Sequence, residues 1–403
     1  MPRATLVLAA VLALFFSPAI LGGGQFMYRD NGRLHLPMKQ YIAGELARGH
    51  LPEWNPWFGL GAPIVAMGVD AVQHPFNLLL VVFPFHLGFK LWVLLSYLLA
   101  GTGGWLWARR LGAGWHAALA AGIAYAFSGF LVSSSDNVTY LTTLAAVPWV
   151  LATFHGWLDA GGPRRLLAFG LASALCAAGG DPMGWGFSMA ALPLCGAAFA
   201  GRGLRLRGFG RGLLAAATGA VAASPFILPV VAWIPASARG EPLEWVEHER
   251  YRLSFIRLLE LFVPHVLRPS PGALSSPVFA VYDANPFTST PWVLSVYLGV
   301  SAVALAALGA TASRRARVLL VGAAVAVWMS LGTHAGFGQV ASRLPILSSF
   351  RYWEKMAVWA VLLVAMASTF GFERLLSDRR AARRFAWAVG AVAAVAIAAR
   401  SLG

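Results

Sequence analysis

Charged side chains are scarce in this sequence. They make up 12% of its 403 residues, against roughly 25% in an ordinary soluble domain. Hydrophobic residues make up 58%, and the mean hydropathy is +0.67. Apolar runs of about 20 residues, long enough to cross a hydrocarbon core of roughly 30 Å, recur along most of the chain. These features exclude a soluble domain and predict an all-α polytopic membrane protein.

Cysteine is nearly absent as well. The two cysteines, Cys176 and Cys195, both fall in apolar runs, where thiols pack as small hydrophobic groups. This excludes a disulfide framework and the usual zinc patterns. The net charge of +15 does not indicate nucleic-acid binding, because the basic residues form short clusters between apolar runs, as membrane topology requires.

The apolar runs predict about eleven transmembrane helices in a single integral membrane domain over residues 1–403. We expect residues 4–21 to be a retained first span rather than a signal peptide, because no A-x-A cleavage site follows them. Pro84 divides the long stretch 75–107 into an interfacial or re-entrant piece and a crossing from about Leu87. The other predicted crossings are residues 115–132, 139–158, 166–178, 184–200, 213–233, 292–310, 318–331, 356–372 and 385–402.

The basic clusters predict the orientation. With Arg3 in the cytoplasm, the positive-inside rule places residues 109–110, 164–165 and 202–211 there too. Two long loops, residues 23–74 and 235–291, then lie outside, and residues 253–262 of the second have the apolar spacing of an interfacial helix. Of the 16 acidic residues, three fall inside: Asp159, Glu373 and Asp378. This favours chemistry at the outer face, although long loops hold more polar residues in any case.

Asp30 is the candidate catalytic residue of the first loop. It follows the first span directly, beside Arg29 and near Arg33. A carboxylate at the membrane surface can act as a general base while neighbouring cations bind a phosphate. A solvated residue that ends a span explains its position at least as well.

The rest of the first loop holds candidate binding residues. Prolines stiffen residues 49–63, where Trp54 and Trp57 either stack on a sugar or lie in the interfacial aromatic belt. Asn55 hydrogen-bonds either a substrate or its own turn. His74 follows Asp70 closely, but the ligand spacing does not indicate a metal. We therefore expect no metal cofactor.

Four further candidates lie later in the chain. Asp136 and Asp181 stand at the outer ends of neighbouring crossings, where they either face a shared cavity or cap helices. Arg351 and Glu354 stand where the chain re-enters the membrane. There Arg351 either holds a phosphate or forms an i,i+3 pair with Glu354.

Several motifs occur together in order along most of the chain. They are G-x-L-P-x-W-N-P at residues 49–56, G-x-P at 61–63, HPFNLL at 74–79, SGF at 128–130, GGDP at 179–182 and FRYWEK at 350–355. Together they resemble the YfhO-type bacterial membrane proteins, and the first-loop motif is the most specific part of the resemblance.

The resemblance implies a branch of the GT-C glycosyltransferases. These multispanning enzymes use polyprenyl-phosphate sugars as donors at the outer face of the cytoplasmic membrane, with a catalytic Asp or Glu in the first external loop. Asp30 matches that position. Asp136 and Asp181 stand where the family often has His, so the resemblance carries over to them, and to Arg351, less directly.

We therefore expect a glycosyltransferase that moves a sugar from a polyprenyl-phosphate carrier to an envelope glycan, lipid or protein. Asp30 would be the base, and Arg29, Arg33 or Arg351 would stabilise the departing phosphate. One alternative is a lipid or polysaccharide transporter or flippase, which predicts ionisable residues near the bilayer midplane, where the sequence has few. Another is a non-catalytic envelope-assembly factor, which needs no base.

Overall fold

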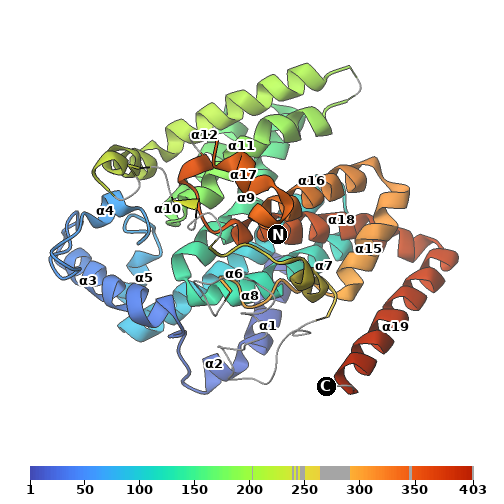
Figure 1. The fold of residues 1–403 in the computed structure, drawn as a ribbon, viewed down its shortest axis with the longest axis horizontal. Coiled ribbons are helices and arrows are strands. Elements are labelled where there is room, and N and C mark those ends of the chain that lie inside the picture. The colour runs from blue at the N-terminus through green and yellow to red at the C-terminus, as the bar shows by residue number, and fades with distance from the viewer. Residues whose placement is uncertain are drawn as a thin grey trace. The chain divides into compact units, whose positions relative to one another are not determined.

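The regular elements of the described structure are helices (Figure 1). The computed structural model describes residues 1–201, 203–237, 240–241, 244–245, 250–263, 291–344 and 347–401. Within these residues, five helical segments are long and apolar enough to cross a membrane: Phe85–Arg110, Trp115–Asp136, Val138–Ala160, Arg205–Ala236 and Trp353–Ser377. This supports an all-α membrane protein, whereas eleven spans and a GT-C fold remain predictions.

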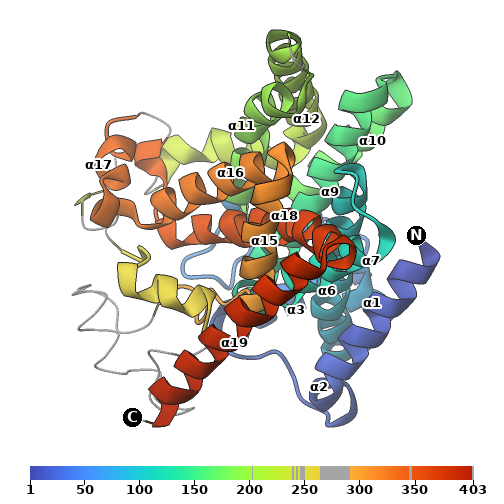
Figure 2. The same ribbon diagram turned by 90° about the vertical axis from the view of Figure 1, so that its right-hand side faces the viewer.

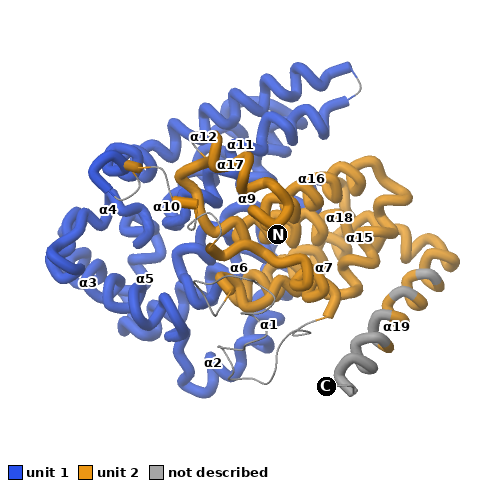
Figure 3. Tube along the Cα trace, viewed as in Figure 1, with its two compact units in different colours: residues 1–111, 134–237 blue, residues 112–133, 238–403 orange. Residues whose placement is uncertain are grey.

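The chain divides into two compact units (Figure 3). Unit 1 comprises Met1–Leu111 and Ser134–Ser237, and unit 2 comprises Gly112–Ser133 and Ala238–Gly403. The expectation of one membrane domain stays a prediction. The helices of unit 1 are α1 (Pro2–Phe15), α2 (Ser17–Leu21), η1 (Asn31–His35), α3 (Leu36–Ala47), α4 (Ile64–Met67), α5 (Asn77–Val82), α6 (Phe85–Arg110), η2 (Ser134–Asp136), α9 (Val138–Ala160), α10 (Pro163–Ala178), α11 (Pro182–Phe199), α12 (Arg205–Trp233) and η3 (Ile234–Ala236).

Helix α9 is the buried centre of unit 1, packed against α6, α10 and α11. Three indole N–H groups form hydrogen bonds between α9 and α6. Trp92 donates to Thr142 Oγ1 at 2.8 Å, Trp149 to the carbonyl of Leu99 at 2.8 Å, and Trp107 to His155 Nδ1 at 3.2 Å. Polar groups within apolar helices need such partners, because lipid offers none.

Small residues bring α11 and α12 together. A Cβ at Gly196 would overlap the carbonyl of Gly208, so the two backbones touch, as small residues allow in membrane helices. The opposite face of α12 is apolar and exposed, which suits contact with lipid. It includes Leu206, Leu213, Leu214, Val221, Leu228 and Val231.

Prolines set two helix boundaries in unit 1. The predicted break at Pro84 is confirmed, since α5 ends at Val82 and α6 begins at Phe85. The predicted first span is interrupted, because α1 ends at Phe15 and α2 restarts with Pro18 in its first turn. Proline lacks an N–H and clashes with the preceding turn, so it is accommodated at a helix start.

Unit 2 is built around α18, which packs against α15 and α16 (Figure 2). A Cβ at Gly371 of α18 would overlap the carbonyl of Leu305 of α15. The helices of this unit are α7 (Trp115–Ala126), α8 (Gly129–Ser133), η4 (Phe255–Leu261), α15 (Val300–Ala312), α16 (Arg314–Ser330), η5 (Gly332–Ala335), α17 (Phe337–Ala341), η6 (Leu347–Ser349), η7 (Trp353–Met356), α18 (Ala357–Ser377) and α19 (Arg379–Ser401).

The expected helix over residues 292–310 was wrong in its first part. Helix α15 begins at Val300, and residues 291–299 form a non-helical segment. The backbone N–H of Gly129 donates to the carbonyl of Tyr297 at 2.7 Å, and that of Ser295 donates to Ser133 Oγ at 2.9 Å. Contacts with α8 thus replace helical hydrogen bonds that the apolar sequence favoured.

A helix expected at residues 253–262 is present as the 3-10 helix η4, and its interfacial position stays a prediction. Phe255 and Leu259 are exposed, whereas Arg257 and Glu260 are buried. Two of its apolar side chains therefore face outward, which suits an interfacial position. Residues 264–290 of the predicted second loop lie outside the described residues.

Candidate functional site

Asp30 and Asp136 meet in unit 1. Asp30 is half-buried and immediately precedes η1. Arg29 Nη1 lies 3.1 Å from Asp136 Oδ2, and Asn137 Nδ2 donates to Asp30 Oδ2 at 3.4 Å. The charge of Asp30 also acts on Asp136. The structure thus brings two predicted carboxylates near each other, and one of them, Asp136, pairs with the Arg29 guanidinium.

Asn31 is fully buried and holds in place the region where Asp30 and Asp136 approach each other. Its Nδ2 donates to the carbonyls of Phe26 at 3.1 Å and Ser135 at 2.7 Å, while its Oδ1 accepts from the backbone N–H of Val138 at 3.0 Å. One amide therefore joins the first loop to the start of α9. Sequence reasoning missed this role, because two of its three partners, Ser135 and Val138, lie far away in the chain.

The backbone at Arg29 is unusual. Its φ of 49° lies in the left-handed region, which a non-glycine residue adopts at a cost of about 1–3 kcal/mol. Such conformations persist where the surroundings hold them. Here the ion pair with Asp136 holds the side chain of Arg29, and the anchored Asn31 fixes the backbone that follows it.

His35 lies one turn further along η1. It is 1% exposed. Burial lowers the pKa of its imidazole to about 3, helped by the charge of Lys39 and opposed by a contact with Asn137. His35 is therefore neutral at physiological pH and adds no positive charge near Asp30.

Lys39 is the centre of a second, fully buried polar cluster. Its Nζ donates to the carbonyl of Asp70 at 2.6 Å and to Asn77 Oδ1 at 3.1 Å, and it lies 3.9 Å from the centre of the Trp92 ring. His74 stacks on the same ring at 5.4 Å. The side chain of His74, a predicted binding residue, is thus 2% exposed and packs inside the cluster.

Burial governs the charges of this cluster. It raises the pKa of the Asp70 carboxyl and lowers the pKa of the Lys39 ammonium, while the attraction between the two opposes both shifts. It also lowers the pKa of His74 to about 3. The burial of Lys39 could in principle have been predicted from the sequence. Lys39 lies three and four residues before Ile42 and Ala43, which are buried on the same face of the helix.

Asp181 caps a helix. Its Oδ2 accepts from the backbone N–H of Gly184 at 2.8 Å at the start of α11. Gly180 just before it has a φ of 94°, and a Cβ there would lie 3.1 Å from the backbone nitrogen of Ala71. The capping interpretation of Asp181 therefore has direct structural support.

The proline-rich segment is a closed turn with an exposed aromatic tip. Asn55 and Ala62 exchange both backbone hydrogen bonds, and Asn55 Oδ1 accepts from the backbone N–H of Trp57 at 2.9 Å. Asn55 thus holds its own turn and is 4% exposed. Trp54 is 53% exposed and Trp57 is 83% exposed, so both rings are accessible to a ligand or to lipid.

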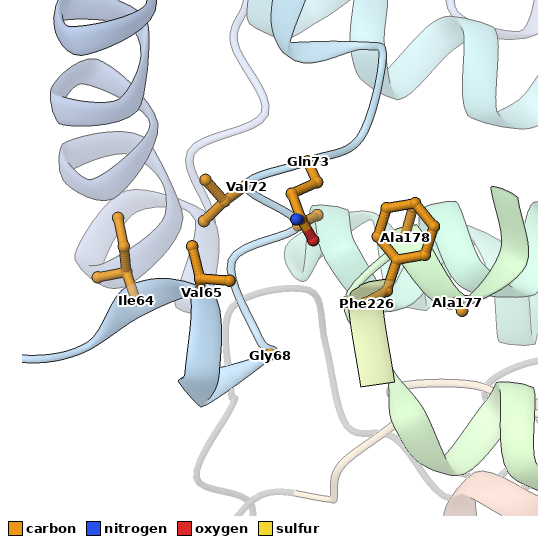
Figure 4. A pocket seen from close by; sticks show the side chains of 10 residues that line it. Ile64, Val65, Gly68, Val72, Gln73, Ala177, Ala178 and Phe226 are labelled. Carbon is orange, nitrogen blue, oxygen red and sulfur yellow. The ribbon is translucent and has the colours of Figure 1, made fainter. Parts of the chain in front are cut away.

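A small hollow, with space for about one water molecule, lies beside the first loop. Figure 4 shows the amide of Gln73 pointing into this space from the loop. The hollow is far smaller than an ordinary ligand pocket of about 300–1,000 Å³. Its other walls include Val65, Val72, Ala177, Ala178 and Phe226.

Glu354 belongs to unit 2 and is fully buried. Its Oε1 pairs with Arg257 Nη1, and its Oε2 accepts from the backbone N–H of Trp292 at 3.0 Å. Arg257 also contacts Glu260 Oε2 at 3.2 Å. Glu354 therefore binds protein groups in this structure.

Arg351 also belongs to unit 2 and stacks on an aromatic pair. Its guanidinium lies 4.6 Å from the centre of the Tyr352 ring, which in turn stacks on Trp292 at 4.9 Å. Lys355 Nζ lies 4.9 Å from the Trp292 ring. Two cations thus flank one aromatic pair.

Arg33 remains exposed on η1. Among the residues that the structure describes, no group of three His, Cys, Asp or Glu side chains is placed to hold a metal ion. The expectation of a metal-free site stays a prediction. No protein-family model and no curated protein matches this chain.

Proposed function

We propose that this chain is a membrane glycosyltransferase that moves a sugar from a polyprenyl-phosphate carrier to an acceptor hydroxyl at the outer face of a bacterial cytoplasmic membrane. One observation carries the proposal. Asp30, expected from the first-loop motif to be the base, lies with Asp136 and Arg29 in a single constellation. A carboxylate that merely ends a span would not need these partners.

The proposed step is a single displacement. Asp30 takes the proton of the acceptor hydroxyl as its oxygen bonds to the anomeric carbon. The bond from that carbon to the phosphate oxygen breaks, and polyprenyl phosphate leaves with the electron pair. Half-burial leaves Asp30 open to an acceptor, while Asn137 orients its carboxylate.

Cations near Asp30 serve the leaving phosphate in this proposal. Arg33 is exposed on the helix that begins after Asp30. Arg29 is paired with Asp136, so we assign Arg29 to stabilising the site. Arg33 is then the cation that binds the phosphate. The exposed rings of Trp54 and Trp57 supply stacking surfaces for sugar or lipid.

The test is transfer by the full-length protein in membrane vesicles, using a panel of polyprenyl-phosphate-linked hexoses and pentoses. Asp30→Asn keeps the size of the side chain and removes the base, so we expect transfer to fall about 10²–10⁴-fold. The matched control is Glu53→Gln, an exposed acid of the same loop, which should transfer at the wild-type rate.

Mass spectrometry of envelope glycans and lipid-linked sugars in a deletion strain complements this assay. Accumulated donor with a missing product sugar, restored by wild-type protein but not by Asp30→Asn, supports transfer. Full transfer by an inserted, folded Asp30→Asn protein would refute Asp30 as the base. A missing product sugar with the donor lipid confined to the inner leaflet would instead support a flippase.

A further inference from the structure

The chain turns back on itself at residues 55–62, and the base of this turn is held firmly. The backbones of Asn55 and Ala62 exchange two hydrogen bonds, of 2.8 and 2.9 Å. Tyr41 Oη, on α3, donates to the carbonyl of Trp54 at 2.8 Å. The base of the turn is therefore fixed to α3, and the residues beyond it form a defined tip.

Gly61 shapes this tip. Its φ of 101° lies in the region that favours glycine, and its backbone N–H donates to the carbonyl of Phe58 at 3.0 Å. A Cβ at this position would lie 2.6 Å from the ring of Trp54, so the ring packs directly on the Gly61 backbone. The side chains of Trp57, Phe58 and Leu60 stay exposed.

The tip is apolar throughout. No charged residue occurs between Glu53 and Asp70. The one side-chain amide of the turn, that of Asn55, is buried and accepts from the backbone N–H of Trp57. Leu60, by contrast, is fully exposed. Large apolar side chains that are exposed together mark a surface that contacts a partner or lipid.

The turn leads directly into α4, which packs on the C-terminal part of α12. A Cβ at Gly68, which follows α4, would lie 2.5 Å from Val230 Cγ2. This part of the chain belongs to an apolar segment of membrane-spanning length, and it exposes three apolar side chains spaced three residues apart: Leu228, Val231 and Ile234. The tip is thus joined to the end of a segment whose exposed face suits lipid.

We propose that this apolar tip, formed by Trp57, Phe58 and Leu60, enters the lipid leaflet at the C-terminal end of α12 and docks the first loop on the membrane surface. Tryptophan and other large apolar side chains are favoured at the boundary between headgroups and acyl chains. A sugar is the less suitable occupant, because its hydroxyl groups need hydrogen-bond partners and the side chains of the tip offer only one indole N–H. The inference concerns the membrane alone and does not depend on the transfer reaction.

Charged and polar side chains precede the tip. Arg48, His50 and Glu53 are all exposed. Such side chains are stable among water and headgroups, whereas the apolar residues that follow them are stable below that level. The change from charged to uncharged residues after Glu53 therefore predicts where the loop meets the membrane surface.

Depth measurement by electron paramagnetic resonance tests the proposal on the full-length protein in phospholipid nanodiscs. A nitroxide is attached to Leu60→Cys in a Cys195→Ala background, and buried Cys176 is left in place. Its collisions with oxygen, which dissolves in lipid, are compared with its collisions with a water-soluble nickel chelate. We expect this nitroxide to lie about 5–10 Å below the boundary between headgroups and acyl chains. The parent protein without the added cysteine gives the background signal.

Glu53→Cys is the matched control, because Glu53 is an exposed residue of the same loop just before the tip. Its nitroxide should collide mainly with the nickel chelate. Phe58→Asp, introduced into the Leu60→Cys protein, adds a charge that lipid disfavours. It should move the nitroxide at position 60 toward water. The side chains of Leu60 and Phe58 are exposed, so these changes should leave the fold intact.

Photolabelling of the wild-type protein with a diazirine phospholipid avoids any added label. We expect mass spectrometry to find lipid adducts on residues 57–60, and soluble oligosaccharides should not reduce them. A nitroxide at position 60 that collides mainly with the nickel chelate would overturn the proposal. Adducts that oligosaccharides displace would overturn it in favour of a glycan. Dipolar broadening between nitroxides at position 60 in liposomes would overturn it in favour of contact between two copies of the chain.

Discussion

Arg29 and Asp136 form an ion pair with 3.1 Å between Nη1 and Oδ2, although one lies in the first loop and the other at the end of η2. Their side chains are 20% and 11% exposed. A pair shielded to this extent is weakly screened by salt. It can therefore hold the left-handed backbone at Arg29 and bring the carboxylates of Asp30 and Asp136 together.

The first prediction concerns this pair. Arg29→Met and Asp136→Asn should each destabilise the protein, and the double variant should lose less than the sum of the two, with a coupling of about 1 kcal/mol. The reason is that either single change leaves one shielded charge unpaired. Unfolding of the protein in lipid, followed by steric trapping, gives the four free energies of the cycle.

Arg48 and Glu45 provide the comparison cycle, because their pair is formed by an exposed guanidinium. Its coupling should be close to zero and should vanish in 0.5 M salt, a concentration that shortens the screening length to about 4 Å. Additive losses at Arg29 and Asp136 would show that their contact does not support the site.

Much of the fold could be predicted from the sequence, because lipid imposes a simple rule on it. Long apolar runs must be helical, and the break at Pro84 follows from the chemistry of proline. The same rule misplaced the start of α15. There the backbone groups of residues 291–299 find partners such as Gly129 and Ser133, which no local pattern shows.

The candidate site was predictable only residue by residue. Asp30 and Asp136 were each identified from their positions at the ends of apolar runs. Their meeting depends on Asn31, whose partners Ser135 and Val138 are distant in sequence. A carboxylate that caps a helix, such as Asp181, and one that pairs across the fold, such as Asp136, look alike until the fold brings partners together.

The second prediction concerns pH. Burial lowers the pKa of both His35 and His74 from 6.5 to about 3. Between pH 6.5 and 3 each imidazole takes up a proton in the unfolded chain but not in the folded protein, so its contribution to the free energy of unfolding falls on acidification. The carboxyl of Asp70, whose pKa burial raises to about 6, contributes in the opposite sense. At pH 5 the loss is about 2 kcal/mol for each histidine. Steric trapping at a series of pH values measures this slope.

His35→Leu should lose about 2 kcal/mol less than the wild type on acidification to pH 5, because the contribution of this imidazole is removed. His50→Leu is the control, since the side chain of His50 is 70% exposed, and it should leave the slope unchanged. A His35→Leu protein whose free energy of unfolding falls with acid as steeply as that of the wild type would contradict a neutral, buried His35 imidazole.

The third prediction tests whether Glu354 stabilises the fold through its ion pair or contacts substrate. Arg257→Met would leave two buried carboxylates, Glu354 and Glu260, without their shared guanidinium. We expect a loss of about 3–5 kcal/mol. Glu354→Gln keeps Arg257 paired with Glu260, but its amide group then faces a donor, either Arg257 or the N–H of Trp292, at a cost of about 1–3 kcal/mol.

Thermal unfolding of the two variants in nanodiscs should therefore show a much larger fall in Tm for Arg257→Met than for Glu354→Gln. Both variants should have a lower Tm than the wild type. If Glu354 instead contacts substrate, Glu354→Gln would keep the wild-type Tm and lose donor affinity, measured as a rise in KM. Because Glu354 has no exposed surface, the stability effect should come first and the change in KM should stay within twofold.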